Sequence, residues 1–346
     1  MSRAPLTAGL GGIPRRMPPR RTVLRAAGLA GLSAVAGIGL AGCGIRLEDD
    51  APTIPFVSRQ PIPDEALLVA AYRRATALAG VAGRATGVPL APEVTQRHTR
   101  QAQVLRAILE TGQVPERIIS GPPGSTATAT SGPTAPVDGT ATTASTSAPT
   151  NAVPPPVTAG ELARAARDTA DASIAAAGSF VTQRALGVAI AAHDAAGAAS
   201  LAAPPVWPTR DPLPAPVATP LVGVTRACEY ALEVAAAHLL DTDRESLLAT
   251  VAALTRREAT LAAALTPDPL PALGYHLPFP VTGPDDARRL VSVVLRNLVD
   301  RGLDDLDRIP QGSSALLEVV RLEAEAVTLA VAHGVAWPTM PGLALG

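Results

Sequence analysis

The chain has 346 residues and a formal net charge of −1, with 30 acidic residues nearly balanced by 29 basic ones, all of them arginine. This balance excludes the strongly basic surface that nucleic-acid binding requires. Only 2% of the residues are aromatic, and apolar residues recur with gaps of three and four instead of alternating. The composition and spacing therefore predict an all-α protein.

The first 42 residues have the order of a signal peptide, with arginines, then an apolar run, then small residues. The apolar run, 26–40, is shorter than the roughly 20 residues that a membrane-spanning helix needs. The stretch around Arg20 and Arg21 resembles the twin-arginine export signal. Leu40-Ala41-Gly42-Cys43 resembles the bacterial lipobox, in which the cysteine becomes the lipidated first residue. We therefore expect a twin-arginine lipoprotein signal peptide at 1–42 and lipidation at Cys43.

These resemblances imply a location and a set of partners. The protein would be lipid-anchored at the outer face of the cell membrane, after contact with the twin-arginine translocase and the lipoprotein-processing enzymes. Removing 1–42 would leave 23 arginines against 30 acidic residues. The acyl chains, and not surface charge, would therefore attach the protein to the membrane. Acylation of Cys43 would leave Cys228 without an internal partner. Its apolar surroundings predict a packing role, with a reactive or ligating thiol as the alternative.

The mature chain divides into helical and proline-rich stretches. Residues 43–62 form a tether, 63–203 a first helical bundle, 204–220 a proline-rich linker, and 221–346 a second bundle. Within the first bundle, the Ser/Thr/Pro/Ala-rich stretch 121–156 predicts a disordered insertion. Periodicity and capping residues predict helices at 64–83, 92–112, two within 158–202 that break near 178, and then 221–240, 244–265, 284–301 and 313–333.

The two bundles share short sequence landmarks in the same order. Arg100 with Val104-Leu105 aligns with Arg256 and Thr260-Leu261. Two further pairs align: Pro156-Val157-Thr158 with Pro280-Val281-Thr282, and Trp207-Pro208-Thr209 with Trp337-Pro338-Thr339. We therefore expect a tandem duplication of a four-helix unit, the alternative being one irregular helical domain.

A long connection between the second and third helices is the connectivity of ferritin-like bundles. The second half also resembles a ferritin-like domain of unknown function found in actinobacterial proteins. The residues that carry this resemblance are the segment Tyr275–Val281, the pair Arg256-Arg257, and Trp337 followed by Pro341-Gly342-Leu343. It covers about 217–346. The resemblance implies an all-α fold with two ferritin-like four-helix bundles.

Ferritin-like di-iron sites use Glu-x-x-His pairs, and this chain contains none, so no metal ligand is carried over. Glu258 lies on a predicted inward stripe with Leu254 and Leu261. With Glu229 and Glu323 it could form a weak metal site for iron or manganese, or a proton site. The alternatives are a buried Glu258 paired with an arginine, such as Arg226 or Arg296, or a solvent-exposed seam.

Two histidines of the first half also fall on core-facing stripes, His98 on the second helix and His193 on the fourth. They could face each other and bind metal. Alternatively, each could hydrogen-bond a backbone carbonyl as part of a polar core.

The functional prediction is a lipid-anchored extracytoplasmic helical protein that acts as a non-enzymatic binding or scaffold module of the cell envelope, with no cofactor. One alternative is a metal-dependent redox or storage protein that uses iron or manganese at a divergent carboxylate site. Another is a carrier of a small apolar ligand.

Overall fold

The computed structural model describes residues 59–121, 155–267, 269–272 and 274–343. Within these ranges the regular structure is helical, apart from one isolated bridge between Ala85 and Val157. The all-α prediction is therefore confirmed for the described part of the chain. The predicted signal peptide, with Arg20 and Arg21, the lipidation site Cys43 and nearly all of the Ser/Thr-rich insertion lie outside the described residues.

Four long helices make up each half of the described chain. The first half holds α1 (Glu65–Gly83), α2 (Ala91–Thr111), the short α3 (Glu116–Ile119), α4 (Ala159–Ala177) and α5 (Arg184–Ser200). The second holds α6 (Ala215–Ala236), α7 (Asp241–Ala262), α8 (Pro284–Asp300), the 3₁₀ helix η1 (Leu306–Arg308) and α9 (Ala315–Ala332). The long helices match the predicted ones, whereas α3 and η1 are too short for periodicity to show.

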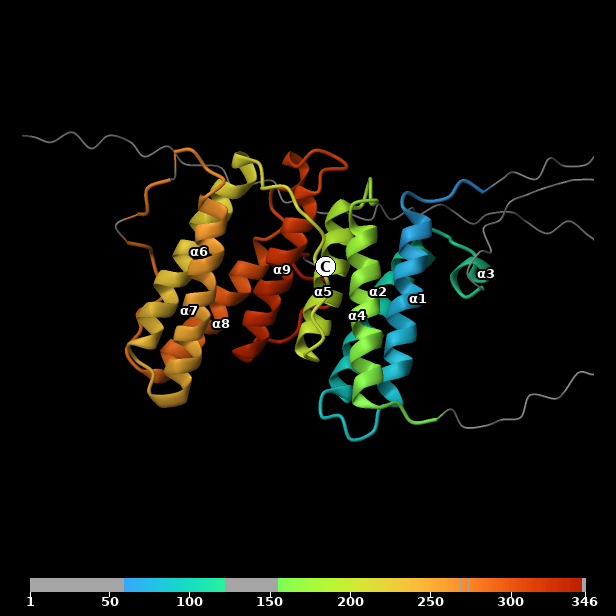
Figure 1. Cartoon of the computed structure of the whole chain (residues 1–346), viewed down its shortest axis with the longest axis horizontal. Coiled ribbons are helices and arrows are strands. Elements are labelled where there is room, and N and C mark those ends of the chain that lie inside the picture. The colour runs from blue at the N-terminus through green and yellow to red at the C-terminus, as the bar shows by residue number, and fades with distance from the viewer. Residues whose placement is uncertain (1–58, 122–154, 268, 273, 344–346) are drawn as a thin grey trace, which may run out of the picture. The chain divides into compact units, whose positions relative to one another are not determined.

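The helices of the two halves pack in the same pattern. In the first half α1 packs on α2 and α4, and α4 packs on α5. In the second half α6 packs on α7 and α8, and α8 packs on α9. The last helices of the two halves, α5 and α9, pack against each other in the middle of the molecule (Figure 1). The described residues therefore belong to one compact unit.

Helix α6 begins earlier than expected, at Ala215, inside the predicted linker 204–220. Pro216 occupies the first turn, where a missing N–H costs nothing. Pro220 lies inside the helix and cannot donate to the carbonyl of Pro216. Arg308 Nη1 donates to that carbonyl instead, at 3.5 Å. A proline-rich composition thus concealed the first turns of a helix.

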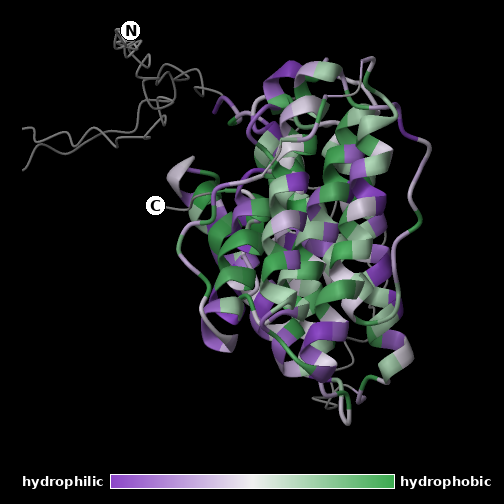
Figure 2. Cartoon of the chain, turned by 90° about the vertical axis from the view of Figure 1, so that its left-hand side faces the viewer, coloured by the Kyte–Doolittle hydropathy of each residue, from purple (hydrophilic) through white to green (hydrophobic). Residues whose placement is uncertain are grey.

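Helix burial follows the amphipathic pattern, and hydrophobic and hydrophilic residues run side by side along the same helices (Figure 2). Helix α5 is the exception, because its residues from Leu186 to Ala198 are all buried. It is covered by α4 on one side and α9 on another. Its alanines and glycines let neighbouring helices approach closely, so any polar side chain on α5 is held in the interior.

The third helix of each half begins in a similar way. The backbone N–H and hydroxyl of Thr158 both donate to Glu161 at the start of α4, as part of a capping box. The backbone N–H and hydroxyl of Thr282 both donate to Asp286 at the start of α8. Both threonines come from the repeated Pro-Val-Thr landmark, so the landmark marks helix starts.

Among the described residues, the helices are too short or too polar to cross a membrane.

Candidate functional site

A buried cluster of polar side chains lies in the interior of the first half. Helix α2 contributes His98 and Gln101, and α5 contributes His193 and Asp194. Each of the four is at most 4% exposed. On the inward face of α2, Gln101 lies one turn and His98 two turns before Leu105. Helix α5 buries His193 and Asp194, which are consecutive and so point in different directions from the helix.

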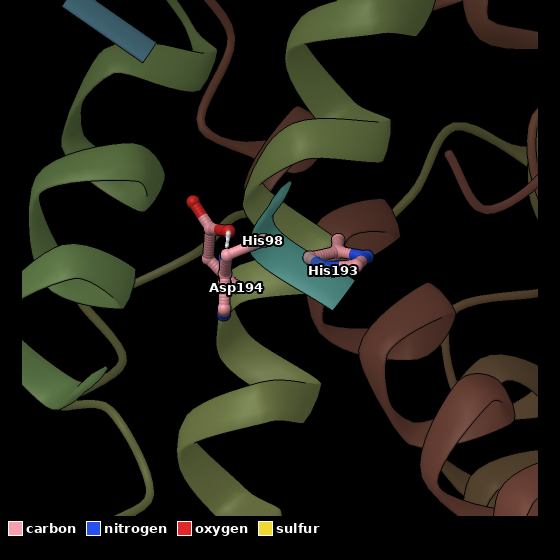
Figure 3. Close-up of side chains that lie close together, drawn as sticks. All are labelled: His98, His193 and Asp194. Carbon is pink, nitrogen blue, oxygen red and sulfur yellow. Dashed lines mark ion pairs between the residues drawn. The ribbon is translucent and has the colours of Figure 1, made fainter. Parts of the chain in front are cut away.

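The carboxylate of Asp194 organises one side of this cluster. Gln101 Nε2 donates to Asp194 Oδ1 at 3.1 Å, and Ser173 Oγ of α4 donates to Oδ2 at 2.6 Å. The Nδ1 atom of His98 lies 3.0 Å from Gln101 Oε1 and 3.9 Å from Asp194 Oδ1. His98 lies between Asp194 and His193 (Figure 3), with the two imidazole centroids 5.2 Å apart and their planes nearly perpendicular.

His193 faces the segment that follows α9, in the second half of the chain. Its Nδ1 lies 3.2 Å from the carbonyl oxygen of Pro338 and 3.1 Å from Nε1 of Trp337. The guanidinium of Arg97 lies over the indole ring of Trp337, 3.7 Å from its centroid. The repeated Trp-Pro-Thr landmark of the second half thus closes the polar centre of the first.

Burial sets the protonation states in the cluster. It lowers the pKa of His98, which nearby Asp194 partly restores, and it lowers the pKa of His193 well below its usual value. Both imidazoles are therefore neutral at pH 7. Burial raises the pKa of Asp194, and His98 and the hydrogen bonds from Ser173 and Gln101 oppose that rise. The cluster thus holds neutral nitrogen donors beside a carboxylate.

These side chains form the one group of three potential metal ligands found among the described residues. A nitrogen of His98, a nitrogen of His193 and an oxygen of Asp194 all lie within 4.8 Å of one another. A cavity of about 220 Å³ lies against this group, between α2 and the C-terminal segment. Its lining includes His193, Arg97, Arg100 and Trp337. Of the three potential ligands, His193 is the one that lines this cavity.

The predicted inward position of Glu258 is wrong. The leucines of the predicted stripe on α7 are buried, but between Leu254 and Leu261 the buried residue is Arg257 and not Glu258. The buried positions are Leu247, Thr250, Leu254, Arg257 and Leu261, so Arg257 lies inside and Glu258 is half-buried beside it. Glu258 Oε1 accepts from Arg226 Nε at 2.7 Å. The alternative of a carboxylate paired with Arg226 is confirmed.

The carboxylates of Glu229 and Glu323 interact with different charged side chains. Glu229 is close enough to Glu258 for the like charges to interact, and burial first and then Glu258 raise its pKa to about 7. Glu323 is fully buried and interacts with Arg257, while burial raises its pKa to about 8. Among the described residues, Glu229, Glu258 and Glu323 form no group that could share an ion. A metal site at these three stays a prediction that the arrangement does not support.

Core-facing helical stripes in the sequence predicted His98 and His193 as a polar core, but they did not include Asp194, Gln101 or Ser173. Asp194 carried a usable signal, because it is the only charged residue between Arg184 and Arg210, in an alanine-rich helix. A lone carboxylate in so apolar a helix needs partners. Gln101 and Ser173 carried no such signal, since both residue types are common on exposed helix faces.

Comparison with models of known protein families, with curated proteins and with solved structures gave no match. The ferritin-like resemblance therefore stays a prediction from the residues on which it was based.

Proposed function

We propose that the protein is an exported lipoprotein, anchored at the outer face of the cell membrane, that acts as a non-enzymatic binding or scaffold module of the cell envelope. The observation that carries this proposal is Leu40-Ala41-Gly42-Cys43 at the end of an arginine-led apolar segment. The state of the second cysteine supports it. Cys228 is buried and burial raises its pKa to about 12, so we do not expect it to be modified, which leaves Cys43 as the candidate for acylation.

We also propose that the two halves are duplicated ferritin-like bundles. The matching pattern of helix packing in the two halves supports this, as do the matching starts of α4 and α8. The sequence offset that aligns Arg100 with Arg256 also places buried Gln101 on buried Arg257. Agreement of packing, capping and burial at landmarks that follow the same order in both halves is expected of a duplication and not of chance tripeptide matches.

The proposed binding or scaffold role follows from where the polar groups lie. In the first half, buried His98 and Asp194 are tied into hydrogen bonds that join α2, α4 and α5. The thiol of Cys228 is protonated at neutral pH. Enclosed groups of this kind position helices and ligands, whereas a nucleophile or general base must reach a substrate.

The polar lining of one cavity does not favour the apolar-carrier alternative. A cavity of about 460 Å³ beside α7 and α9 is lined by the charged side chains Arg210, Asp211, Glu318 and Arg321, among others. Apolar ligands are usually held in pockets lined by hydrophobic and aromatic side chains.

Replacement of Cys43 tests the proposal directly. Cys43→Ala should abolish acylation, measured by mass spectrometry of the N-terminal peptide, and release the protein from the membrane fraction. Cys228→Ala, the matched control, should keep both. Changing Arg20 and Arg21 together to lysine should leave the unprocessed chain in the cytoplasm. A wild-type chain with its N-terminus intact in the soluble cytosolic fraction would contradict the proposal.

A further inference from the structure

We propose that His98, His193 and Asp194 bind a divalent transition-metal ion of the zinc or iron(II) type. Two imidazole nitrogens and a carboxylate oxygen are a donor set that suits such ions. This set is used in catalytic zinc sites and in two-histidine, one-carboxylate iron sites. The proposal differs from the carboxylate site considered from the sequence, because it lies in the first half and uses neither Glu258 nor Glu323.

The first observation in its favour is the state of His193. Its Nε2 is buried and has no hydrogen-bond partner among the described residues. Its other nitrogen, Nδ1, lies within hydrogen-bond distance of the Pro338 carbonyl. Metal-binding histidines commonly donate one N–H to a backbone carbonyl and present the other nitrogen to the ion. The indole N–H of Trp337 also points at this Nδ1, at 3.1 Å, and that contact requires the opposite tautomer. Nε2 therefore offers a lone pair to a metal in the tautomer that donates from Nδ1 to Pro338, and metal binding would exchange the Trp337 contact for it.

The second observation is that no arginine lies within ion-pair distance of Asp194 among the described residues. The one ion-pair contact of Asp194 within 4.0 Å is His98, whose Nδ1 lies 3.9 Å from Oδ1. Arg74 interacts with Asp194 electrostatically without forming such a contact. A buried carboxylate without a close cation is costly. A divalent ion between Asp194 and the histidines would supply that charge.

The third observation is the second layer of hydrogen bonds. Ser173 and Gln101 donate to the two oxygens of Asp194, and such partners orient carboxylates that bind metals. Ligand atoms stand about 2.0–2.2 Å from an ion, so atoms now up to 4.8 Å apart must approach by about 1 Å. His98 Nδ1 would exchange its contact with Gln101 Oε1 for the ion, while Gln101 Nε2 stays bonded to Asp194 Oδ1.

Calorimetric titration of the full chain, purified in detergent and stripped with a chelator, tests this site with zinc chloride as the probe. We expect one zinc ion per chain. His98→Gln, His193→Gln and Asp194→Asn should each weaken binding at least tenfold. Glu258→Gln, a matched carboxylate-to-amide change in the second half, and His276→Gln, at an exposed histidine, should leave the affinity unchanged. Anaerobic titration with iron(II) then decides which of the two ions binds more tightly.

A purely structural role for the cluster predicts a different outcome. The ligand variants would then lower the melting temperature, and zinc would neither bind stoichiometrically nor raise the melting temperature of the wild type. Ser173→Ala keeps the test valid if the ligand variants fail to fold. It leaves all three ligands in place but removes a hydrogen bond to Asp194, so it should lower zinc affinity by about 10–100-fold. Absence of stoichiometric zinc in the folded wild type, or stoichiometric zinc that survives all three ligand changes, would overturn the proposal.

Discussion

The two halves bury polar side chains at matching helix positions, but the partners of their buried carboxyl groups differ in charge. The offset between Arg100 and Arg256 places Gln101 opposite Arg257, and the offset between Trp207 and Trp337 places His193 opposite Glu323. All four of these side chains are buried. The first half surrounds its carboxylate with neutral donors, whereas the second half places a guanidinium inside.

The second half therefore carries its own cation. Arg257 donates through Nη1 to the carbonyl of Leu322 at 2.7 Å, and Glu325 and then Glu323 favour its charge. In the first half the equivalent position is the uncharged Gln101, and Asp194 accepts hydrogen bonds from the neutral Gln101 and Ser173, with Arg74 as a weaker electrostatic partner. One helical scaffold thus supports two kinds of interior, and the exchange of one residue type decides which kind forms.

The largest expected effect comes from removing the internal cation. Arg257→Met should cost about 3 kcal/mol of unfolding free energy near pH 8, because it leaves buried carboxylates without their positive partner. Urea unfolding measures this cost. Arg256→Met, at the exposed neighbouring position, should change stability by no more than about 0.5 kcal/mol. Equal effects of the two changes would show that Arg257 has no special role.

A double variant sharpens the comparison. Adding Glu323→Leu to Arg257→Met removes both buried charges and should recover most of the lost stability. Strictly additive losses would show that Arg257 and Glu323 do not interact.

A smaller effect is expected at Gly302. A Cβ atom there would lie 1.8 Å from Glu323 Oε2, so the buried carboxylate has to move. Gly302→Ala should cost about 1–3 kcal/mol, and less when Glu323 is already alanine. Gly223→Ala is the control, because a Cβ at that exposed helical position meets nothing within 4 Å and should stabilise α6 by up to about 1 kcal/mol. A loss at Gly302 that is independent of Glu323 would contradict the contact.

The smallest predicted change is a dependence on pH. Burial raises the pKa of Glu323 from 4.5 to about 8, so between these values the folded chain holds a proton that the unfolded chain has lost. The stabilising effect of that proton is complete below pH 4.5 and is lost as the pH rises through about 8. Glu323→Gln should remove this contribution and be about 1–2 kcal/mol more stable than the wild type at pH 8. A difference from wild type that stays the same at pH 5 and pH 8 would argue against it.

Much of the fold could be predicted because its signals are local. Pro284 and the following acidic residues marked the start of α8, which runs to Asp300, within one residue of the predicted end. Local signals failed at Pro220, where a residue that usually interrupts helices lies inside α6. The missing donor is offset by Arg308, 92 positions away along the chain, and no local pattern contains that contact.

The candidate site was predictable only in part. His98 and His193 were each assigned to an inward stripe, but which stripes meet depends on how α2 and α5 pack. On α7 the sequence allowed either position 257 or 258 to face inward, because steps of three and of four from Leu254 both fit a helix. Only the packing of α7 on α6 and the hydrogen bond from Arg257 to the Leu322 carbonyl of α9 place Arg257 inside.

By itself the sequence determined the helical class, the order and approximate bounds of the long helices, and the expectation of an exported, acylated N-terminus. These depend on residue type and on spacing along the chain. The tertiary structure alone decided that His98, His193 and Asp194 lie together and that Trp337 closes their site from the other half of the chain. Such meetings depend on how whole helices pack, and residues far apart in sequence carry no local record of it.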